Sequence, residues 1–204
     1  MRLKVHPSIK HGHSILAKVA TKTQKSLEEW KAIISTEGLG DAGSAKTWLK
    51  DNYEIGKTTL GTIVNWAFDE NPNNFDPDQY LADAPQIVDA QYHGKRERIR
   101  PILNKIIEAA EALGEDVGAS PCKKFVPLYR HHAFAQIKPT GLKRIDLGLA
   151  LKGYEGDMPA FIFDTGEREG ITHRIPLYSI EDITDEVKDW LKIAYDLDEK
   201  APVK

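Results

Sequence analysis

A cluster of basic side chains in the middle of the chain could bind an anion. Residues 120–152 contain seven Lys and Arg residues against a single acid, Asp146, which leaves a net charge of +6. If they lie on the open face of a sheet, these cations gather on one surface. We predict an anion-binding surface made of Lys123, Lys124, Arg130, Lys138, Lys143, Arg144 and Arg174. The alternative is that the cations only protect strand edges and keep the sheet soluble.

Three histidines offer a different kind of site. His131 and His132 lie at a predicted hairpin tip and His173 on a later strand, where imidazoles could ligate a metal or act as acid and base. Adjacent strand residues point to opposite faces, so only one of the first two could join His173. The alternative site is therefore a His and Arg174 pocket between the sheet and the loop at residues 160–163.

A second basic cluster lies near residue 100. Lys95, Arg96, Arg98 and Arg100 stand at the start of a predicted helix, where positive charge opposes the helix dipole. Two explanations remain open at this point: the cations bind a partner, or they pair with the acidic segment at residues 153–204, whose net charge is -7.

Composition limits the remaining classes. Cys122 is the only cysteine, so an intramolecular disulfide is excluded and a reducing, cytoplasmic location is expected. Apolar runs are too short for a membrane span, so no membrane partner is expected. The chain also lacks phosphate-binding Gly loops, nucleophile elbows and metal-binding helix motifs, so we expect no cofactor and no metal. No pattern indicates an oligomeric state.

The first third of the chain predicts a small helical module. Residues 1–20 form a basic N-terminal segment, and residues 21–70 carry three short helical patterns. The first pattern starts at a capping box made by Ser26 and Glu29. Two of the helices could form a DNA-binding helix-turn-helix, but the net charge of -2 over residues 21–70 favours a packing module.

An α+β domain is predicted after a turn-rich linker at residues 71–84 and extends over residues 85–199. A helix over residues 99–113 contains Pro101, either as a kink or in its first turn. Strands are predicted at residues 124–130, 133–138, 144–151 and 171–177, with loops at 153–170. A closing helix starts at a Ser179 N-cap. The predicted fold is a mostly antiparallel sheet with two helices covering one face.

The sequence resembles an uncharacterised bacterial two-domain family. In that family a short helical domain of unknown function with a KSLEEW-type start precedes an α+β domain of unknown function. The matching segments are residues 25–30, 56–59, 84–92, 100–102, 123–126, 134–137 and 172–174. The α+β domain is sometimes found behind nuclease-like modules. The resemblance therefore implies an accessory or recognition role near nucleic acid, without a defined activity.

These observations favour a non-enzymatic binding or adaptor protein. Its α+β domain would recognise an anionic partner, with nucleic acid as one candidate, and its helical module would help to place that domain. Two alternatives remain: a small-molecule binding domain or enzyme that uses the histidine pocket, and a protein–protein interaction module that uses the acidic last helix.

Overall fold

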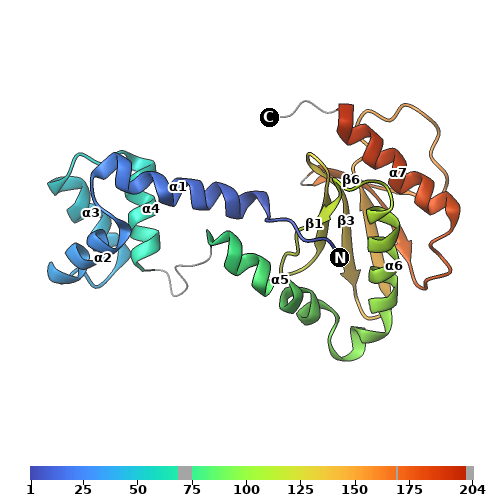
Figure 1. Ribbon diagram of the computed structural model, residues 1–204, viewed down its shortest axis with the longest axis horizontal. Coiled ribbons are helices and arrows are strands. Elements are labelled where there is room, and N and C mark those ends of the chain that lie inside the picture. Colours follow the sequence, from blue (N-terminus) through green and yellow to red (C-terminus); the bar gives the residue numbers. More distant parts are fainter. Residues whose placement is uncertain (69–74, 169, 201–204) are drawn as a thin grey trace. The chain divides into compact units, whose positions relative to one another are not determined.

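The chain forms two compact units. In the computed structural model, residues 1–68, 75–168 and 170–200 are described (Figure 1). Residues 5–80 form one unit, here called the helical unit, while residues 1–4 and 81–204 form the other, here called the α+β unit. Residues 71–74 of the predicted linker lie outside the described residues.

Among its described residues, the helical unit contains one complete helix more than predicted. Its helices are α1 (Pro7–Thr23), α2 (Leu27–Thr36), α3 (Ala42–Asn52) and α4 (Lys57–Ala67). Most of the segment expected to be a basic N-terminal tail is α1. Pro7 occupies the first turn and the His6 ring accepts a hydrogen bond from the Ser8 backbone N–H. One face of α1 is apolar enough to bury Val19 in the core of the unit.

Trp30 is the centre of the helical core. Its side chain is fully buried, its Nε1 donates to Thr23 Oγ1 at 2.9 Å, and the ring of Tyr53 meets it edge to face at 4.9 Å. The predicted capping box is confirmed at the start of α2. The Glu29 N–H donates to Ser26 Oγ at 3.1 Å, and the Ser26 N–H donates to Glu29 Oε2 at 2.6 Å.

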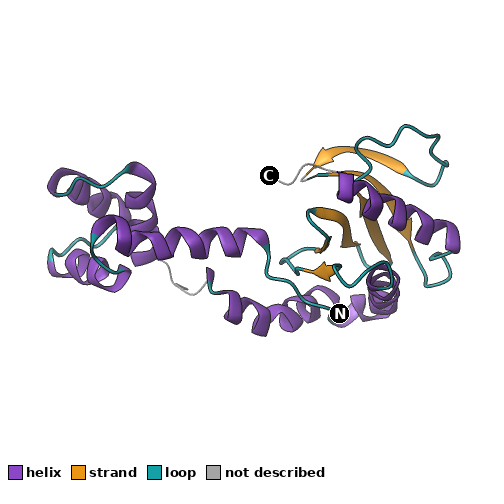
Figure 2. Cartoon of the chain, turned by 45° about the horizontal axis from the view of Figure 1, so that its top comes forward, coloured by secondary structure: helices purple, strands orange, loops and turns teal. Residues whose placement is uncertain are grey.

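The α+β unit combines helices with a six-stranded sheet (Figure 2), and the helices precede and follow the strands in the chain. The first elements are α5 (Pro77–Tyr92), the 3-10 helix η2 (Gly94–Ile99) and α6 (Arg100–Glu111). The strands are β1 (Gly118–Ala119), β2 (Val126–Tyr129), β3 (Ala133–Thr140), β4 (Arg144–Leu149), β5 (Phe163–Arg168) and β6 (Ile171–Leu177), followed by α7 (Asp185–Lys200). Neighbouring strands pair antiparallel in the order β1-β2-β3-β4-β6-β5.

Most predicted elements of this unit are present, with several differences. The part of the predicted linker after Pro77 is helical, and Pro101 lies in the first turn of α6. The predicted Ser179 N-cap is wrong, because α7 begins at Asp185 and Thr184 Oγ1 accepts from the Val187 N–H. Strands β1 and β5 were not predicted, since one has two residues and the other is mostly polar.

Helices α6 and α7 cover one face of the sheet, as predicted (Figure 1). Ile145, Leu147 and Leu149 point from β4 into the same core as the apolar stripes of both helices. Residues between them on β4 point to the other side, which is named the open face below. Side-chain alternation in a strand makes this division unavoidable.

The segment Met1–Lys4 belongs to the α+β unit. Leu3 forms a parallel bridge with Ala119, the Lys4 N–H donates to Ala119 O at 2.9 Å, and the Ala119 N–H donates to Arg2 O at 2.8 Å. This segment therefore extends the sheet beyond β1, and the helical unit is inserted between residues 4 and 81 of the α+β unit.

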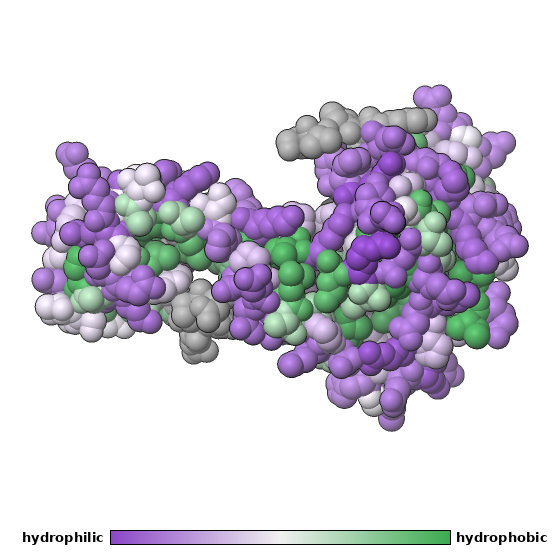
Figure 3. All heavy atoms as spheres, viewed as in Figure 1, coloured by the Kyte–Doolittle hydropathy of each residue, from purple (hydrophilic) through white to green (hydrophobic). Residues whose placement is uncertain are grey.

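The outer surface is mostly hydrophilic around α7 in the view of Figure 3. Among the described residues, no helix combines the length and the apolar character that crossing a membrane requires.

Replacing Ser26 with Ala should destabilise the helical unit by about 1 kcal/mol, because the first turn of α2 loses its side-chain acceptor. Ser35→Ala makes the same chemical change at an exposed position near the end of α2 and should alter the free energy of unfolding by less than about 0.5 kcal/mol. Urea unfolding followed by tryptophan fluorescence measures both variants. Equal stabilities for the two variants would contradict the role of the cap.

Candidate anion-binding site

The open face of the sheet contains a pocket of about 630 Å³. All of its lining residues belong to the α+β unit. They come from the turn before β2 and from strands β3, β4, β5 and β6. The lining consists of Lys124, Phe125, Gln136, Lys138, Asp146, Gly148, Thr165, Ile171 and Arg174.

Strand register explains why these residues meet. Gln136 lies opposite Gly148, and Gly148 lies opposite Arg174, so these positions form a row across β3, β4 and β6. Lys138 lies opposite Asp146 in the next row. Directly opposed residues in antiparallel strands project from the same face of the sheet.

Asp146 is the centre of the polar contacts. Arg144 Nε lies 2.8 Å from Asp146 Oδ1, and Arg174 Nη1 lies 3.3 Å from both carboxylate oxygens. The Thr140 hydroxyl donates to Asp146 Oδ2 at 2.8 Å. A single carboxylate thus holds two guanidinium groups in place on the open face.

The site keeps a positive charge after this pairing. Lys124, Lys138, Arg144 and Arg174 stand against Asp146 alone, which gives +3 for these five side chains. The pKa of Arg144 is raised above its ordinary value, first by a hydrogen bond with Tyr178 and then by Asp146. Arg144 therefore keeps its positive charge at neutral pH.

An exposed aromatic ring stands at the β5 edge of the site. Phe163 lies opposite Arg174 in the β5–β6 pair, and the Arg174 guanidinium carbon is 5.5 Å from the ring centroid. The Phe163 residue is 45% exposed. The contact is a cation–π pair on the face that carries the other cations.

Gly148 allows Ile171 to pack against the floor of the pocket. A Cβ atom at this position would lie 2.8 Å from Ile171 Cγ2, so a larger residue would displace Ile171. The Ile171 side chain thus packs directly on the β4 backbone and makes an apolar part of the pocket wall.

Gln91 positions the turn that carries Lys124 and Phe125. The buried amide of this α5 residue donates from Nε2 to Cys122 O at 2.7 Å and to Phe125 O at 3.4 Å. The Cys122 N–H also donates to Phe125 O, at 2.9 Å. Sequence reasoning missed Gln91, because no local pattern connects it with a turn more than thirty positions away.

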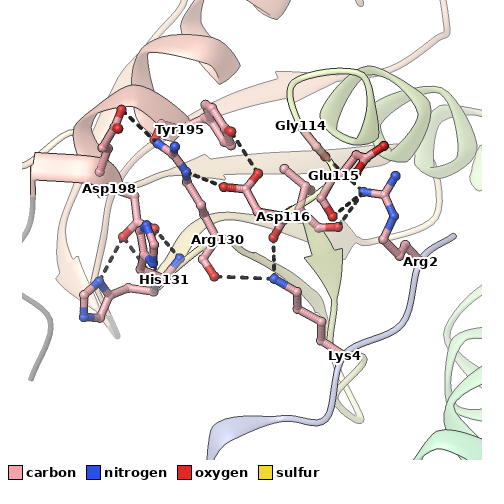
Figure 4. A network of polar contacts seen from close by, with 12 residues as sticks. Arg2, Lys4, Gly114, Glu115, Asp116, Arg130, His131, Tyr195 and Asp198 are labelled. Atoms are coloured by element: carbon pink, nitrogen blue, oxygen red, sulfur yellow. Dashed lines mark hydrogen bonds and ion pairs between the residues drawn. The ribbon is translucent and has the colours of Figure 1, made fainter.

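Arg130 does not join the other predicted cations. Its Nε lies 2.7 Å from Asp116 Oδ2, its Nη1 lies 3.3 Å from Glu199 Oε2, and its guanidinium stacks on the Tyr195 ring at 4.1 Å (Figure 4). Since Tyr195 and Glu199 belong to α7, Arg130 points toward the helix-covered side. Its role is to tie the β2–β3 turn to α7.

Lys123 and Lys143 also stand outside the pocket lining. Both are exposed, the first beside Lys124 and the second in the turn between β3 and β4. Of the seven predicted anion-binding residues, Lys124, Lys138 and Arg174 line the pocket, and Arg144 adjoins it through Asp146.

The three histidines lie in two separate environments. The backbone N–H groups of His131 and His132 donate to the buried Asp198 carboxylate, and His132 Nδ1 lies 3.0 Å from Asp198 Oδ1. His173 Nδ1 instead lies 2.8 Å from Thr172 Oγ1. None of the three lines the pocket, and the described residues contain no group of three or more His, Cys, Asp or Glu that could hold a metal.

Three of the four cations near residue 100 have partners within the α+β unit. Arg96 Nε donates to Gly141 O at 2.8 Å and Arg98 Nε to Leu142 O at 2.9 Å, so η2 holds the β3–β4 turn. Arg100 pairs with Asp89 of α5 at 2.5 Å. The sequence left two explanations open, binding of a partner and pairing with the acidic segment at residues 153–204. The contacts of Arg96, Arg98 and Arg100 correspond to neither.

Comparison with known families places the pocket in a recognised domain. The sequence pattern described as Domain of unknown function (DUF5655) matches residues 88–198, more than half of the chain. The chain belongs to the DUF5655 family. The match starts within α5, ends within α7 and contains every residue that lines the pocket.

The DUF5655 match supports the expected α+β domain of unknown function, while the KSLEEW-type helical domain stays a prediction. No curated protein and no solved structure matches the chain. The family itself carries no assigned activity, so any function has to come from the geometry of the site.

Replacing Asp116 with Asn should reduce the loss of stability in acid. Hydrogen bonding from Arg130, and then from Tyr195, lowers the pKa of Asp116 below its ordinary value of 3.8. A depressed folded-state pKa means that the stabilisation is present above the unfolded pKa and lost as the pH falls through the folded one. Asp116→Asn should have a lower free energy of unfolding than the unsubstituted protein at pH 7. Its free energy of unfolding should then fall less between pH 5 and pH 2.

Urea unfolding measured across this pH range tests the Asp116 prediction. Asp157→Asn removes the same charge at an exposed position and accounts for the effect of net charge alone. A pH profile of Asp116→Asn parallel to that of the unsubstituted protein would contradict the prediction.

Proposed function

We propose that the DUF5655 domain of this chain is a non-enzymatic binding domain that holds an anionic ligand on the open face of its sheet. The observation that carries the proposal is the convergence of Lys124, Lys138 and Arg174 on one pocket, with Arg144 beside it. These residues come from four separate parts of the sequence, and strand register brings them together.

Electrostatics supports an anion in preference to a neutral ligand. Asp146 compensates only one of the four positive charges around the pocket. The guanidinium groups of Arg144 and Arg174 are partly buried, so their field is screened less than that of fully exposed side chains. An incoming phosphate or carboxylate would supply the missing negative charge and accept hydrogen bonds from these donors.

The chemistry of the lining favours binding over catalysis. The oxygens of the one carboxylate, Asp146, are occupied by hydrogen bonds from Thr140 and two arginines. The lining residues include no His or Cys, and Thr165 has its hydroxyl engaged with the Thr172 carbonyl at 3.0 Å. No nucleophile with an adjacent base is available there.

Pocket size keeps a small-molecule ligand as a second candidate. A volume of about 630 Å³ lies within the range of small-molecule pockets, and Phe125 and Ile171 provide apolar wall. This candidate uses the open-face pocket and does not involve the three histidines. A compact anion with an apolar part would fit it.

Replacing Lys138 with Gln, or Arg174 with Gln, should weaken the binding of inorganic tripolyphosphate about tenfold each, the size expected for one lost charge-assisted hydrogen bond. Lys188→Gln is the matched control, because Lys188 lies on α7, which covers the other face. Arg174→Lys keeps the charge but loses the planar guanidinium group, so its affinity for tripolyphosphate should lie between those of the unsubstituted protein and Arg174→Gln.

Isothermal titration at 20 mM and 200 mM salt measures these affinities, and circular dichroism checks that each variant folds. Affinity should fall with salt, because part of the attraction is screened. The proposal fails if tripolyphosphate does not bind at low salt, or if the open-face variants bind as tightly as Lys188→Gln.

A further inference from the structure

We infer that the ligand of the open face is single-stranded nucleic acid. This inference rests on the proposed anion-binding function and adds the identity of the partner. Three features carry it: the width of the charged row, the exposed aromatic ring within it, and the open shape of the surface.

The charged row is wider than one small anion. Lys124 stands before β2 and Arg174 on β6, with β3 and β4 between them. Adjacent strands lie about 4.8 Å apart, so three strand steps span on the order of 14 Å. The row therefore has room for consecutive phosphates of a strand, in addition to a single small anion.

Aromatic rings accompany the cations at both ends of the row. Phe163 is 45% exposed beside Arg174, and Phe125 lines the pocket beside Lys124. Charge alone attracts any polyanion, including polyphosphate or an acidic peptide, but these have no flat rings to stack. Nucleobases stack on Phe rings and on guanidinium planes, and each stacked base contributes measurably to affinity.

The shape of the surface favours a single strand over a duplex. A duplex keeps its bases stacked inside and presents phosphates on a convex surface, so its bases could not reach Phe163 or Phe125. A single strand lays its phosphates along the cations and turns its bases toward the sheet. Between the two ends of the row, Ile171 packs over Gly148 and gives such bases an apolar surface.

The test compares two labelled 12-mers by fluorescence anisotropy with the full chain. One is oligothymidine, and the other is an abasic deoxyribose-phosphate strand with the same length and charge. Oligothymidine should bind at least about tenfold tighter, because only it can stack. Phe163→Ala should remove most of this difference by weakening oligothymidine alone, while Lys138→Gln should weaken both strands.

Controls separate stacking from loss of structure. Phe163→Leu keeps an apolar side chain without a π face and should behave like Phe163→Ala, whereas Phe163→Trp should restore tight binding of oligothymidine. Ile180→Ala truncates an exposed apolar residue of similar exposure, 46%, outside the pocket lining and should leave both affinities unchanged.

The outcomes distinguish this inference from the proposed function. The inference is overturned if the two strands bind equally well, Lys138→Gln weakens the binding of both, and Phe163→Ala weakens the binding of neither. The proposed anion site would still hold in that case. Thymidine monophosphate or a duplex 12-mer binding as tightly as oligothymidine also overturns the inference. If neither strand nor tripolyphosphate binds at low salt, both the inference and the proposed function fail.

Discussion

The ion pairs of Asp146 are the interaction on which the open face depends. Arg144 and Arg174 both contact the Asp146 carboxylate, and without its negative charge the two guanidinium groups would repel each other. Because the Asp146 side chain is only 14% exposed, the attraction is screened less than in a surface pair. The pairing fixes the direction of both guanidinium groups, while Lys124 and Lys138 add further positive charge to the pocket lining. The same face can therefore be ordered and positively charged.

Side-chain alternation is the part of this site that the sequence could predict. The apolar positions Ile145, Leu147 and Leu149 place Arg144 and Asp146 on the opposite side, and the structure has them there. Alternation fails at Arg130 for a local reason. The register shifts between Leu128 and Tyr129, and Arg130 follows in the turn, so its side chain reaches α7 in place of the open face.

Other features lie beyond what local sequence patterns encode. Phe163 was expected in the loop at residues 160–163 and not on a strand, because β5 carries polar residues and Gly166, and its pairing with β6 is irregular between Asp164 and Arg168. The fixed conformation of the Lys124 turn depends on Gln91, which only the tertiary fold brings near. Sequence reasoning therefore finds charges on regular strands, but it misses aromatic and positioning residues that edge strands and distant helices contribute.

The edge pairing of Leu3 has a consequence for the order of folding during synthesis. Arg2 donates to the carbonyl of Gly114, which lies 112 positions later in the chain. At about 5–20 residues per second, a ribosome needs on the order of ten seconds to make this interval. The inserted helices can pack into their own core while the chain is still being synthesised. The segment before them can pair only after β1 has been translated. The edge beside β1 is thus completed by residues that are translated before any of the six strands.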